Sequence, residues 1–371
     1  MMMLLALPML AALAAAPRAQ ERFLETEVID AQRVAGALSA DAPAASWAKL
    51  PATHVLLAPQ RTVRFNDRDA NEALDVLGGP RVLDVRAAYN ERDLALVLEW
   101  RDDSADRAPA TETDRFGDAV AVEVPLAFGP GQRLPYVGMG DERAPVMLYL
   151  QRAIEHGSLG RELVAAGFGS STRSSLGGAR MAMRYDAASR TWRAVLVRPL
   201  VTMGHDLRPG LVPVAFALWD GAHHERGGNK ALSSWKAIRL GGTPLNPAFL
   251  DELSWGYDAP GDVVRGKLLV ETICASCHRT GTRDSAAPGA APPLDQMGLL
   301  ATPSYLRESI VSPDEVIVPG KGWSRRGDDG QHRSLMPSMG GLPPADIVSI
   351  VTYLRTLGVP AGAASAKRSA P

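Results

Sequence analysis

The stretch Cys274-Ala275-Ser276-Cys277-His278 decides how the second part of this chain folds, and it holds both cysteines of the sequence. Two cysteines separated by two residues and followed by a histidine are typical of a c-type haem attachment site. A disulfide or a redox dithiol is the alternative for a Cys-x-x-Cys pair, and the adjacent His278 argues against both. We therefore expect one covalent haem c, fixed by Cys274 and Cys277, with His278 bound to the iron from one face.

The sixth iron ligand is expected in the segment Leu335-Met336-Pro337-Ser338-Met339-Gly340. A low-spin electron carrier needs such a ligand, and methionine or histidine is the usual choice. Met336 is the leading candidate because it precedes the last predicted helix, where a loop can return to the open face of the haem. Met339, three residues further on, stays open as an alternative.

Helical patterns surround this motif. Residues from Val263 to Cys277 can form a helix that ends at the haem site. Residues from Ala345 to Leu357 form a second pattern, which Gly358 and Pro360 terminate. Its apolar residues recur at spacings of three, four and seven, as on one face of a helix: Ile347, Ile350, Val351, Leu354 and Leu357. The sequence therefore predicts an all-α C-terminal domain.

Together these segments resemble a class I cytochrome c, and we assign residues 258–358 to such a domain. The resemblance rests on motifs in this order: Arg265-Gly266-Lys267 before the attachment site, Ala291-Pro292-Pro293-Leu294 after it, Tyr305-Leu306-Arg307-Glu308-Ser309-Ile310, Ile317-Val318-Pro319-Gly320, Met336-Pro337, and Tyr353-Leu354-Arg355-Thr356-Leu357-Gly358. It implies that the backbone carbonyl of Pro293 accepts a hydrogen bond from the His278 ring and so orients this ligand.

The first part of the chain reads as short strands. Alternating or apolar runs occur at Arg81–Tyr89, Leu94–Trp100, Asp118–Val124, Thr191–Arg198 and Val212–Trp219. The first two flank the turn Asn90–Asp93 and predict a β-hairpin. Strands at such intervals favour a mainly antiparallel β-sandwich over residues 21–250. Val146 to Ala166 is the exception, where we expect a helix or an irregular insertion.

Several segments of this part resemble the haem b domain of the gamma subunits of ethylbenzene and dimethylsulfide dehydrogenases. They are spread over residues 45–245: Val97-Leu98-Glu99-Trp100-Arg101-Asp102, Asp118-Ala119-Val120-Ala121-Val122, Gly138-Met139-Gly140-Asp141, Trp219-Asp220-Gly221, Glu225-Arg226-Gly227-Gly228-Asn229-Lys230 and Ser234-Trp235. The resemblance implies a non-covalent haem b whose iron is bound axially by Met139 and Lys230. A cytochrome c domain in the same chain departs from those gamma subunits.

This ligand pair is chemically demanding. Met139 lies between two glycines, which let the backbone approach a porphyrin closely. Lys230 binds iron only as a neutral amine, so its pKa must be depressed by burial and by the iron. His223 and His224 are nearby and are better haem ligands by chemistry. They rank second because the family pattern does not place ligands there.

Length and composition set the frame. The chain has 371 residues, too many for one ordinary core, so two domains are expected. Its formal net charge of −1 gives no indication of a nucleic-acid partner. The apolar run from Met1 to Ala16 is short for a transmembrane helix, and we interpret residues 1–20 as a secretory signal peptide. An uncleaved anchor is the alternative. No other segment approaches transmembrane length, and residues 359–371 read as a disordered tail.

The sequence contains no nucleophile motif, phosphate loop or further metal cluster, so it indicates no enzyme. We expect a periplasmic di-haem electron-transfer subunit that works between a molybdopterin and iron–sulfur oxidoreductase and a soluble cytochrome or respiratory complex. The alternative is a mono-haem c-type carrier whose β-sandwich is a haem-free docking or ligand-binding module. A peroxidase-like enzyme would need an open haem face, against which a Met336 ligand argues.

Overall fold

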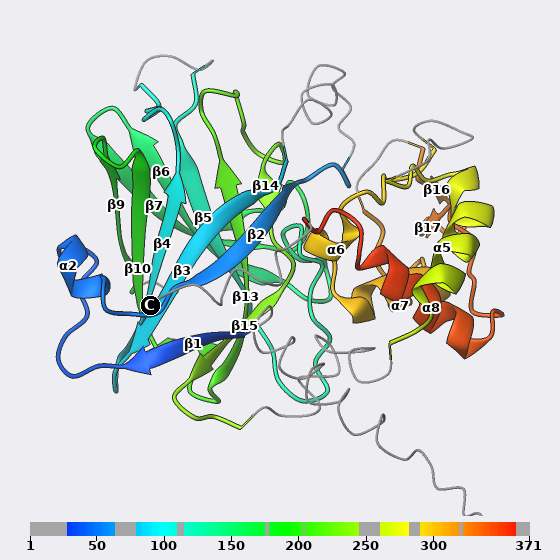
Figure 1. Ribbon diagram of the computed structural model, residues 1–371, viewed down its shortest axis with the longest axis horizontal. Helices are drawn as coiled ribbons and strands as arrows, with labels where there is room; N and C mark the ends of the chain where they lie inside the picture. Colours follow the sequence, from blue (N-terminus) through cyan, green and yellow to red (C-terminus); the bar gives the residue numbers. More distant parts are fainter. Residues whose placement is uncertain are drawn as a thin grey trace, which may run out of the picture.

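The computed structural model describes residues 28–63, 79–109, 115–174, 178–202, 205–244, 260–281, 290–318 and 322–360. Within these ranges the strands of the first part gather on one side and the helices of the last part on the other (Figure 1). The expected class is confirmed: a mainly antiparallel β-sheet domain precedes a helical domain. The expected signal peptide, and the domain boundary near residues 250–258, lie outside the described residues, as does most of the expected tail.

The β domain contains β1 (Val28–Arg33), α2 (Ala44–Trp47), β2 (Thr53–Pro59), β3 (Arg81–Tyr89), β4 (Asp93–Arg101), β5 (Ala119–Pro125), β6 (Val146–Ile154), β7 (Gly157–Ala165), β8 (Thr172–Arg173), β9 (Arg180–Asp186), β10 (Thr191–Pro199), β11 (Val201–Thr202), β12 (His205–Asp206), β13 (Leu211–Trp219), β14 (Ala231–Leu232) and β15 (Lys236–Leu240). The order of hydrogen-bonded strands is β8-β7-β6-β5-β13-β14-β2-β3-β4-β10-β9, and β15 and β1 bridge β13 to β3. Pairing is antiparallel except where β1 joins β15 and β3.

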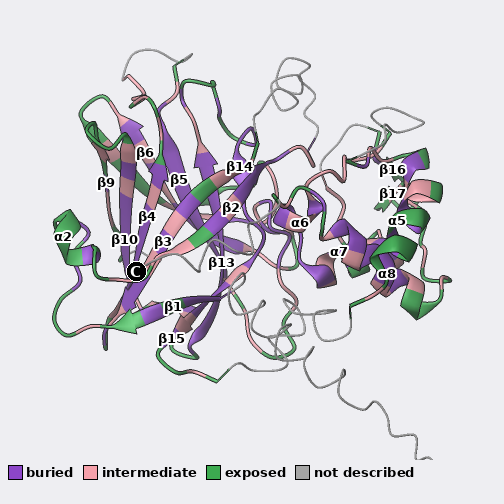
Figure 2. Ribbon diagram, in the orientation of Figure 1, coloured by how far each residue is buried: buried purple, intermediate pink, exposed green. Residues whose placement is uncertain are grey.

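The core lies between two layers of this sheet. One apolar cluster combines residues of β3, β4 and β10 with residues of β5, β6 and β13. The predicted hairpin is present, because β3 and β4 pair in antiparallel register from Asp84–Glu99 to Tyr89–Leu94. All seven residues of β5 are buried, so this strand is covered on both faces (Figure 2). Its even and odd positions therefore both point into protein, which matters below for Glu123.

The expectation of a helix or insertion at Val146 to Ala166 is wrong. The segment forms the hairpin β6–β7, with the turn at Glu155 and His156 and a left-handed Gly157 (φ 120°). β6 also pairs with β5 from Val146 to Arg152. Its residues Val146 to Leu150 are mostly buried, so packing between two neighbouring strands outweighs the local helix propensity of this stretch.

The helical domain contains α5 (Val263–Thr272), the 3₁₀ turn η1 (Cys274–Ser276), α6 (Met297–Leu300), α7 (Pro303–Val311) and α8 (Pro344–Leu354). Asp262 caps α5 by accepting the N–H groups of Val264 and Arg265. One departure from an all-α domain is the two-stranded pair β16 (Ser324–Arg326) and β17 (His332–Ser334). In the described part of the chain, no helix is both long and apolar enough to cross a bilayer.

Helices α5 and α8 cross closely at Gly266. A Cβ on this residue would overlap the carbonyl of Ser349, so only glycine allows the two backbones to approach. The predicted apolar face of α8 is buried at Ile347, Ile350 and Val351. This crossing places the end of α5, and with it the Cys-x-x-Cys-His motif, in a fixed position relative to α8.

The two domains share one apolar cluster. It combines β-domain residues such as Val146 and Trp235 with Leu300 and Leu306 of the helical domain. α6 packs against β2, and the Ser234 N–H donates to the Leu299 carbonyl across the boundary (2.8 Å). The domains are therefore packed together, as the position of α6 beside β2 and β14 in Figure 1 illustrates.

Candidate functional site

The first candidate site forms where α5 ends. The carbonyl of Cys274 accepts the N–H groups of Cys277 (3.1 Å) and His278 (2.8 Å), which closes a tight turn around the motif. The His278 Nδ1 lies 2.7 Å from the Pro292 carbonyl oxygen. Because a carbonyl can only accept, Nδ1 carries the proton and Nε2 keeps its lone pair for a metal. Burial lowers the pKa of His278, which favours this neutral imidazole.

The carbonyl that orients His278 is that of Pro292, and the expectation of Pro293 is wrong by one residue. The reason lies in the local backbone: the Leu294 N–H donates to the Arg279 carbonyl (2.8 Å), which turns residue 294 toward the histidine segment. Residues 292 and 294 are therefore the two that hydrogen-bond to His278 and Arg279.

The two cysteines are unbridged and differ in environment. Cys274 is partly buried and Cys277 is exposed. Burial, followed by the neighbouring Cys277, raises the pKa of Cys274 to about 11, so this thiol is not a reactive thiolate at neutral pH. An unbridged Cys pair beside an imidazole with a free Nε2 fits the donor set of a covalent haem c. It does not fit a structural disulfide.

Met336 and Met339 both lie on the loop before α8, partly buried against the shared apolar cluster. Their anchors differ. The Met339 N–H donates to the Ile310 carbonyl at the end of α7 (2.8 Å), whereas the Met336 N–H donates to the nearby Ser334 hydroxyl (3.1 Å). Both thioethers remain on the apolar side of the loop, so the choice between them stays a prediction.

The second candidate site lies in the β domain at the turn that carries Met139. The Gly140 N–H donates to the Tyr136 carbonyl (2.8 Å), and the Met139 carbonyl accepts from Gly167 (2.9 Å). Met139 has a φ of 79°, a conformation that is rare for a residue with a side chain. Such a backbone is held only where its surroundings determine it, and it is common at functional sites. The strained residue is the one predicted to bind iron.

Lys230 is 3% exposed. Its ammonium group lies over the rings of Trp219 (5.3 Å) and Phe168 (5.8 Å). Burial lowers the pKa of Lys230, and the nearby negative charge of Glu123 opposes that shift. A lysine in this environment can become the neutral amine that iron binding requires.

Glu123 joins the two predicted ligands, and the sequence reasoning missed it. Its carboxylate accepts a hydrogen bond from the Met139 N–H and is the charged neighbour of Lys230. Its Oε1 atom is buried and accepts no hydrogen bond from any residue that the structure describes. The only available signal was a carboxylate within an otherwise apolar run, Val120 to Val124. A turn methionine, a buried lysine and an incompletely satisfied carboxylate together fit a buried ligand such as haem b.

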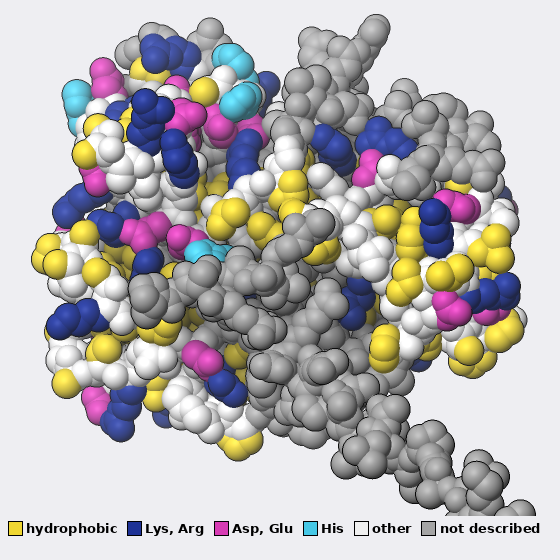
Figure 3. All heavy atoms as spheres, viewed as in Figure 1, with side chains coloured by type: hydrophobic (Ala, Val, Ile, Leu, Met, Phe, Trp, Pro, Cys, Tyr) yellow, Lys and Arg dark blue, Asp and Glu magenta, His cyan; other side chains and the backbone are white. Residues whose placement is uncertain are grey.

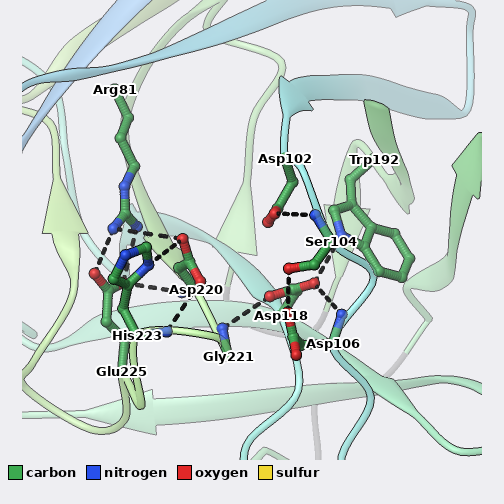
Figure 4. A network of polar contacts seen from close by, with 10 residues as sticks. All are labelled: Arg81, Asp102, Ser104, Asp106, Asp118, Trp192, Asp220, Gly221, His223 and Glu225. Carbon is green, nitrogen blue, oxygen red and sulfur yellow. Dashed lines mark hydrogen bonds and ion pairs between the residues drawn. The ribbon is translucent and has the colours of Figure 1, made fainter. Parts of the chain in front are cut away.

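A polar network fixes the loop that leads to Lys230 (Figure 4). Arg81 of β3 forms a two-pronged ion pair with Glu225, whose carboxylate also accepts the Asp220 N–H (2.9 Å). The Gly221 N–H donates to Asp118 (2.8 Å). The loop between β13 and β14 is therefore tied to β3 and to the residue that precedes β5.

The same network brings the carboxylates of Asp102, Asp118 and Asp220 together. The carboxylate of Asp118 already has hydrogen-bond partners. It accepts the Trp192 indole N–H (2.9 Å), the Asp106 N–H (2.8 Å) and the Gly221 N–H. Burial raises the pKa of Asp118 to about 7 and that of Asp102 to about 6. The cluster thus supports the loop through the hydrogen bonds of Asp118, and burial favours the protonated forms of Asp102 and Asp118.

His223 and His224, the second-ranked ligands, lie outside the site. Both are exposed, and the His223 Nδ1 is 2.8 Å from the Asp220 carboxylate. His224 has a left-handed backbone (φ 55°) within the same turn. Of the residues proposed for the second iron, the structure brings together Met139 and Lys230 and leaves these two histidines at the surface.

Comparisons with known proteins were made at the level of family, sequence and structure. The Cytochrome c family matches residues 263–358. The chain is 32% identical over 240 residues to chlorate reductase subunit gamma of Ideonella dechloratans, covering 62% of this chain and 89% of that protein. It is 29% identical over 214 residues to a protein assigned as a respiratory nitrate reductase haem subunit (ORF7) of Haloferax mediterranei, covering 57% and 71%. It is 27% identical over 206 residues to dimethylsulfide dehydrogenase subunit gamma of Rhodovulum sulfidophilum, covering 52% and 72%.

Among solved structures, a carbohydrate binding module of family 9 from Caldicellulosiruptor kristjanssonii covers 60% of this chain and 100% of its own, with a TM-score of 0.34 and 9% identity. This likeness is too distant to inform function. The fold and the His278 site instead define an electron-transfer protein in which a cytochrome c domain follows a β-sheet domain. More specifically, the chain belongs to the family of gamma subunits that includes those of chlorate reductase and dimethylsulfide dehydrogenase.

Proposed function

We propose that this protein carries two haems and relays single electrons between a molybdenum oxidoreductase and a respiratory cytochrome in the periplasm. The observation that supports it most is the convergence of Met139 and Lys230 on the buried carboxylate of Glu123, in a chain that also holds a Cys-x-x-Cys-His site. The gamma-subunit relatives belong to oxidoreductases, which supports a partner of that kind. The apolar run from Met1 to Ala16 supports export.

The chain's own residues have distinct tasks in this proposal. Cys274 and Cys277 hold one haem covalently, and the Pro292 carbonyl keeps His278 in the tautomer that binds iron. Met336 or Met339 completes that site. In the β domain, Met139 and Lys230 would hold the second haem iron. When bound, the two groups supply reversible one-electron redox chemistry.

The protein is then a non-catalytic subunit. Two protein ligands to each iron would leave no position for a substrate, and the haems would then supply outer-sphere electron transfer. Exposed apolar side chains on α5, next to the attachment motif, support the docking of a redox partner on this face. Val264 is 78% exposed and Leu268 is 52% exposed, and Figure 3 shows hydrophobic side chains at the surface of this domain.

Haem content per chain tests the proposal. The full protein would be exported in a host with cytochrome c maturation and ample haem, and acid–acetone extraction would separate covalent from extractable haem. One covalent and one extractable haem per chain are expected. Covalent haem alone would overturn the haem b site and leave a mono-haem carrier with a docking domain.

A further inference from the structure

A pair of tyrosine rings joins the two domains. Tyr136, in the turn that carries Met139, meets Tyr305 of α7 with ring centroids 5.7 Å apart and ring planes 36° from parallel. Tyr136 is 6% exposed, and Tyr305 packs against the shared apolar cluster. Among the described residues, this is the aromatic contact that crosses the boundary.

Tyr136 is connected by a short path to the predicted iron ligand Met139, and Tyr305 to the loop that carries both candidate sixth ligands, Met336 and Met339. On the β side, the hydrogen bond between the Tyr136 carbonyl and Gly140 closes the turn that contains Met139. On the helical side, α7 carries Tyr305 and also ends at the Ile310 carbonyl, which accepts the N–H of Met339. The Ser338 hydroxyl adds a second tie to the Val311 carbonyl (2.6 Å). The ring contact therefore lies between the methionine turn of one domain and the methionine loop of the other.

We propose that the Tyr136–Tyr305 contact is the path by which electrons cross between the two haem sites. The inference rests on the proposed function. With both haems bound, one electron would pass from ferrous iron held by Met139 and Lys230 to ferric iron held by His278, or in the reverse direction. No bond forms or breaks, no proton moves, and neither ring is oxidised.

The environment of the two phenols supports this passive role. Burial raises the pKa of Tyr136 to about 12 and also raises that of Tyr305. The hydroxyl of Tyr136 has the neutral side chain of Thr62 as a hydrogen-bond neighbour, and the nearby charge of Glu123 adds to the increase of its pKa. Both phenols thus stay protonated. The two rings fill the space between the domains and so shorten the distance that an electron must cross without intervening atoms.

The boundary contains two further features, a cavity and an ion pair. A cavity of about 470 Å³ opens beside the pair and is lined by Arg133 and Trp235 on one side and by Leu300 and Glu308 on the other. An exposed ion pair, Arg143–Glu315 (2.6 Å), lies farther out. Direct contact between aromatic side chains is therefore concentrated at the tyrosines.

The test measures the rate of electron transfer between the two haems of the full protein after rapid photoreduction of one of them. Tyr305→Leu and Tyr136→Leu are compared with Tyr305→Phe and Tyr136→Phe, which keep the rings. We expect several-fold slower transfer in each Leu variant and near wild-type rates in each Phe variant. Reduction potentials and haem content should be unchanged in all four.

Glu315→Gln is the matched control, because it removes a cross-domain contact without a ring and should leave the rate unchanged. Tyr136→Leu could slow transfer simply by disturbing the turn that carries Met139. Tyr305→Leu removes the same ring contact from the other domain and leaves this turn intact. If Leu variants that hold both haems transfer electrons at the wild-type rate, the proposed path through the Tyr136–Tyr305 contact is overturned, and the proposed function is not. A wild-type protein with one haem would overturn the proposed function, and the bridge with it.

Discussion

A buried lysine can bind iron only after it gives up its proton, and the surroundings of Lys230 set how readily that happens. Burial favours loss of the proton, whereas the charge of Glu123 and the cation–π contacts with the rings of Trp219 and Phe168 favour the ammonium form. A single Lys230 variant therefore also leaves a buried carboxylate without its cation, which typically costs about 3–5 kcal/mol. The variants must therefore distinguish the loss of the iron ligand from the loss of protein stability.

The first prediction uses a double variant for this reason. Lys230→Met combined with Glu123→Gln should lose most of the extractable haem and keep the covalent haem, because the ligand is gone and no unpaired charge remains. Met139→Ala should give the same result by removing the other ligand. Acid–acetone extraction and absorption spectra measure both outcomes. Lys49→Ala, at an exposed lysine of the same domain, is the control and should keep both haems.

The second prediction concerns the sixth ligand of haem c. Met336→Ala should lower the reduction potential and allow the ferrous protein to bind carbon monoxide, because a thioether favours ferrous iron and its loss opens a position. Met339→Ala should leave both properties near wild type, since the backbone of Met339 holds the loop to α7 through Ile310. Potentiometric titration and carbon monoxide spectra are the measurements. The reverse pattern would assign Met339 as the ligand.

Among single residues, the sequence predicted those that belong to a motif and missed those whose role depends on contacts between distant segments of the chain. His278 and the pair Met139 and Lys230 stand in recognisable local patterns, so they could be named in advance. Glu123 could not be named, because its role depends on strand pairing that brings β5 beside the Lys230 loop. The choice of Pro292 over Pro293 likewise depends on a backbone direction that one hydrogen bond of Leu294 fixes.

Among the secondary-structure elements, the crossing of α5 and α8 depends on a glycine, Gly266. Gly266→Ala should lower the free energy of unfolding of the helical domain by about 1–3 kcal/mol, because the added methyl group meets the Ser349 backbone and the helices must separate. The yield of covalent haem should fall as well. Chemical denaturation measures the first effect and haem staining the second. Gly341→Ala, where a Cβ meets nothing within 4 Å, should change stability by less than about 0.5 kcal/mol.

The loop between β13 and β14 is the corresponding element of the β domain. Arg81→Met removes the partner of the buried Glu225, so we expect the Lys230 loop to shift, haem b to be retained less well and its absorption bands to move. Haem c serves as the internal reference in the same spectrum. Arg184→Met breaks the exposed pair with Asp41 (2.9 Å) and should alter neither. Unchanged haem b in Arg81→Met would mean that the loop does not depend on this network.

Element type was predictable where one periodicity dominated. The β3–β4 hairpin and α8 follow from their apolar patterns and punctuating residues. The error at β6–β7 arose because residues Met147 to Arg152 suit a helix as well as a strand, and only pairing with β5 decides between them. The sequence of a fully buried strand does not alternate between apolar and polar residues. Its conformation can therefore be predicted only when its neighbouring strands are known.

For the whole molecule, the sequence predicted two domains and their order, but not their contact. The residues of that contact, such as Val137 and Leu300, look like ordinary core positions of their own domains. Nothing in a single sequence distinguishes an apolar residue that packs inside a domain from one that packs against a neighbour. The tyrosine pair became visible only once both domains were placed.

The stability of the whole protein should depend on pH through the carboxylate network of the β domain. The pKa of Asp102 is raised from 3.8 to about 6, mainly by burial. In this interval the folded state holds a proton that the unfolded chain has lost, so this contribution is full below about pH 4 and is lost as the pH rises through 6. Asp118, raised to about 7, acts in the same direction.

Asp102→Asn should therefore stabilise the protein at about pH 8 and make little difference near pH 4. After discounting for its partial exposure, the gain is about 1–2 kcal/mol. Denaturant titrations at several pH values measure it. Asp186→Asn is a control of opposite sign, because the hydroxyl of Ser189 lowers the pKa of Asp186 and its loss should weaken stability above pH 4. If Asp102→Asn and wild type differ equally at every pH, Asp102 does not hold a proton in the folded state, and the network contributes through its hydrogen bonds alone.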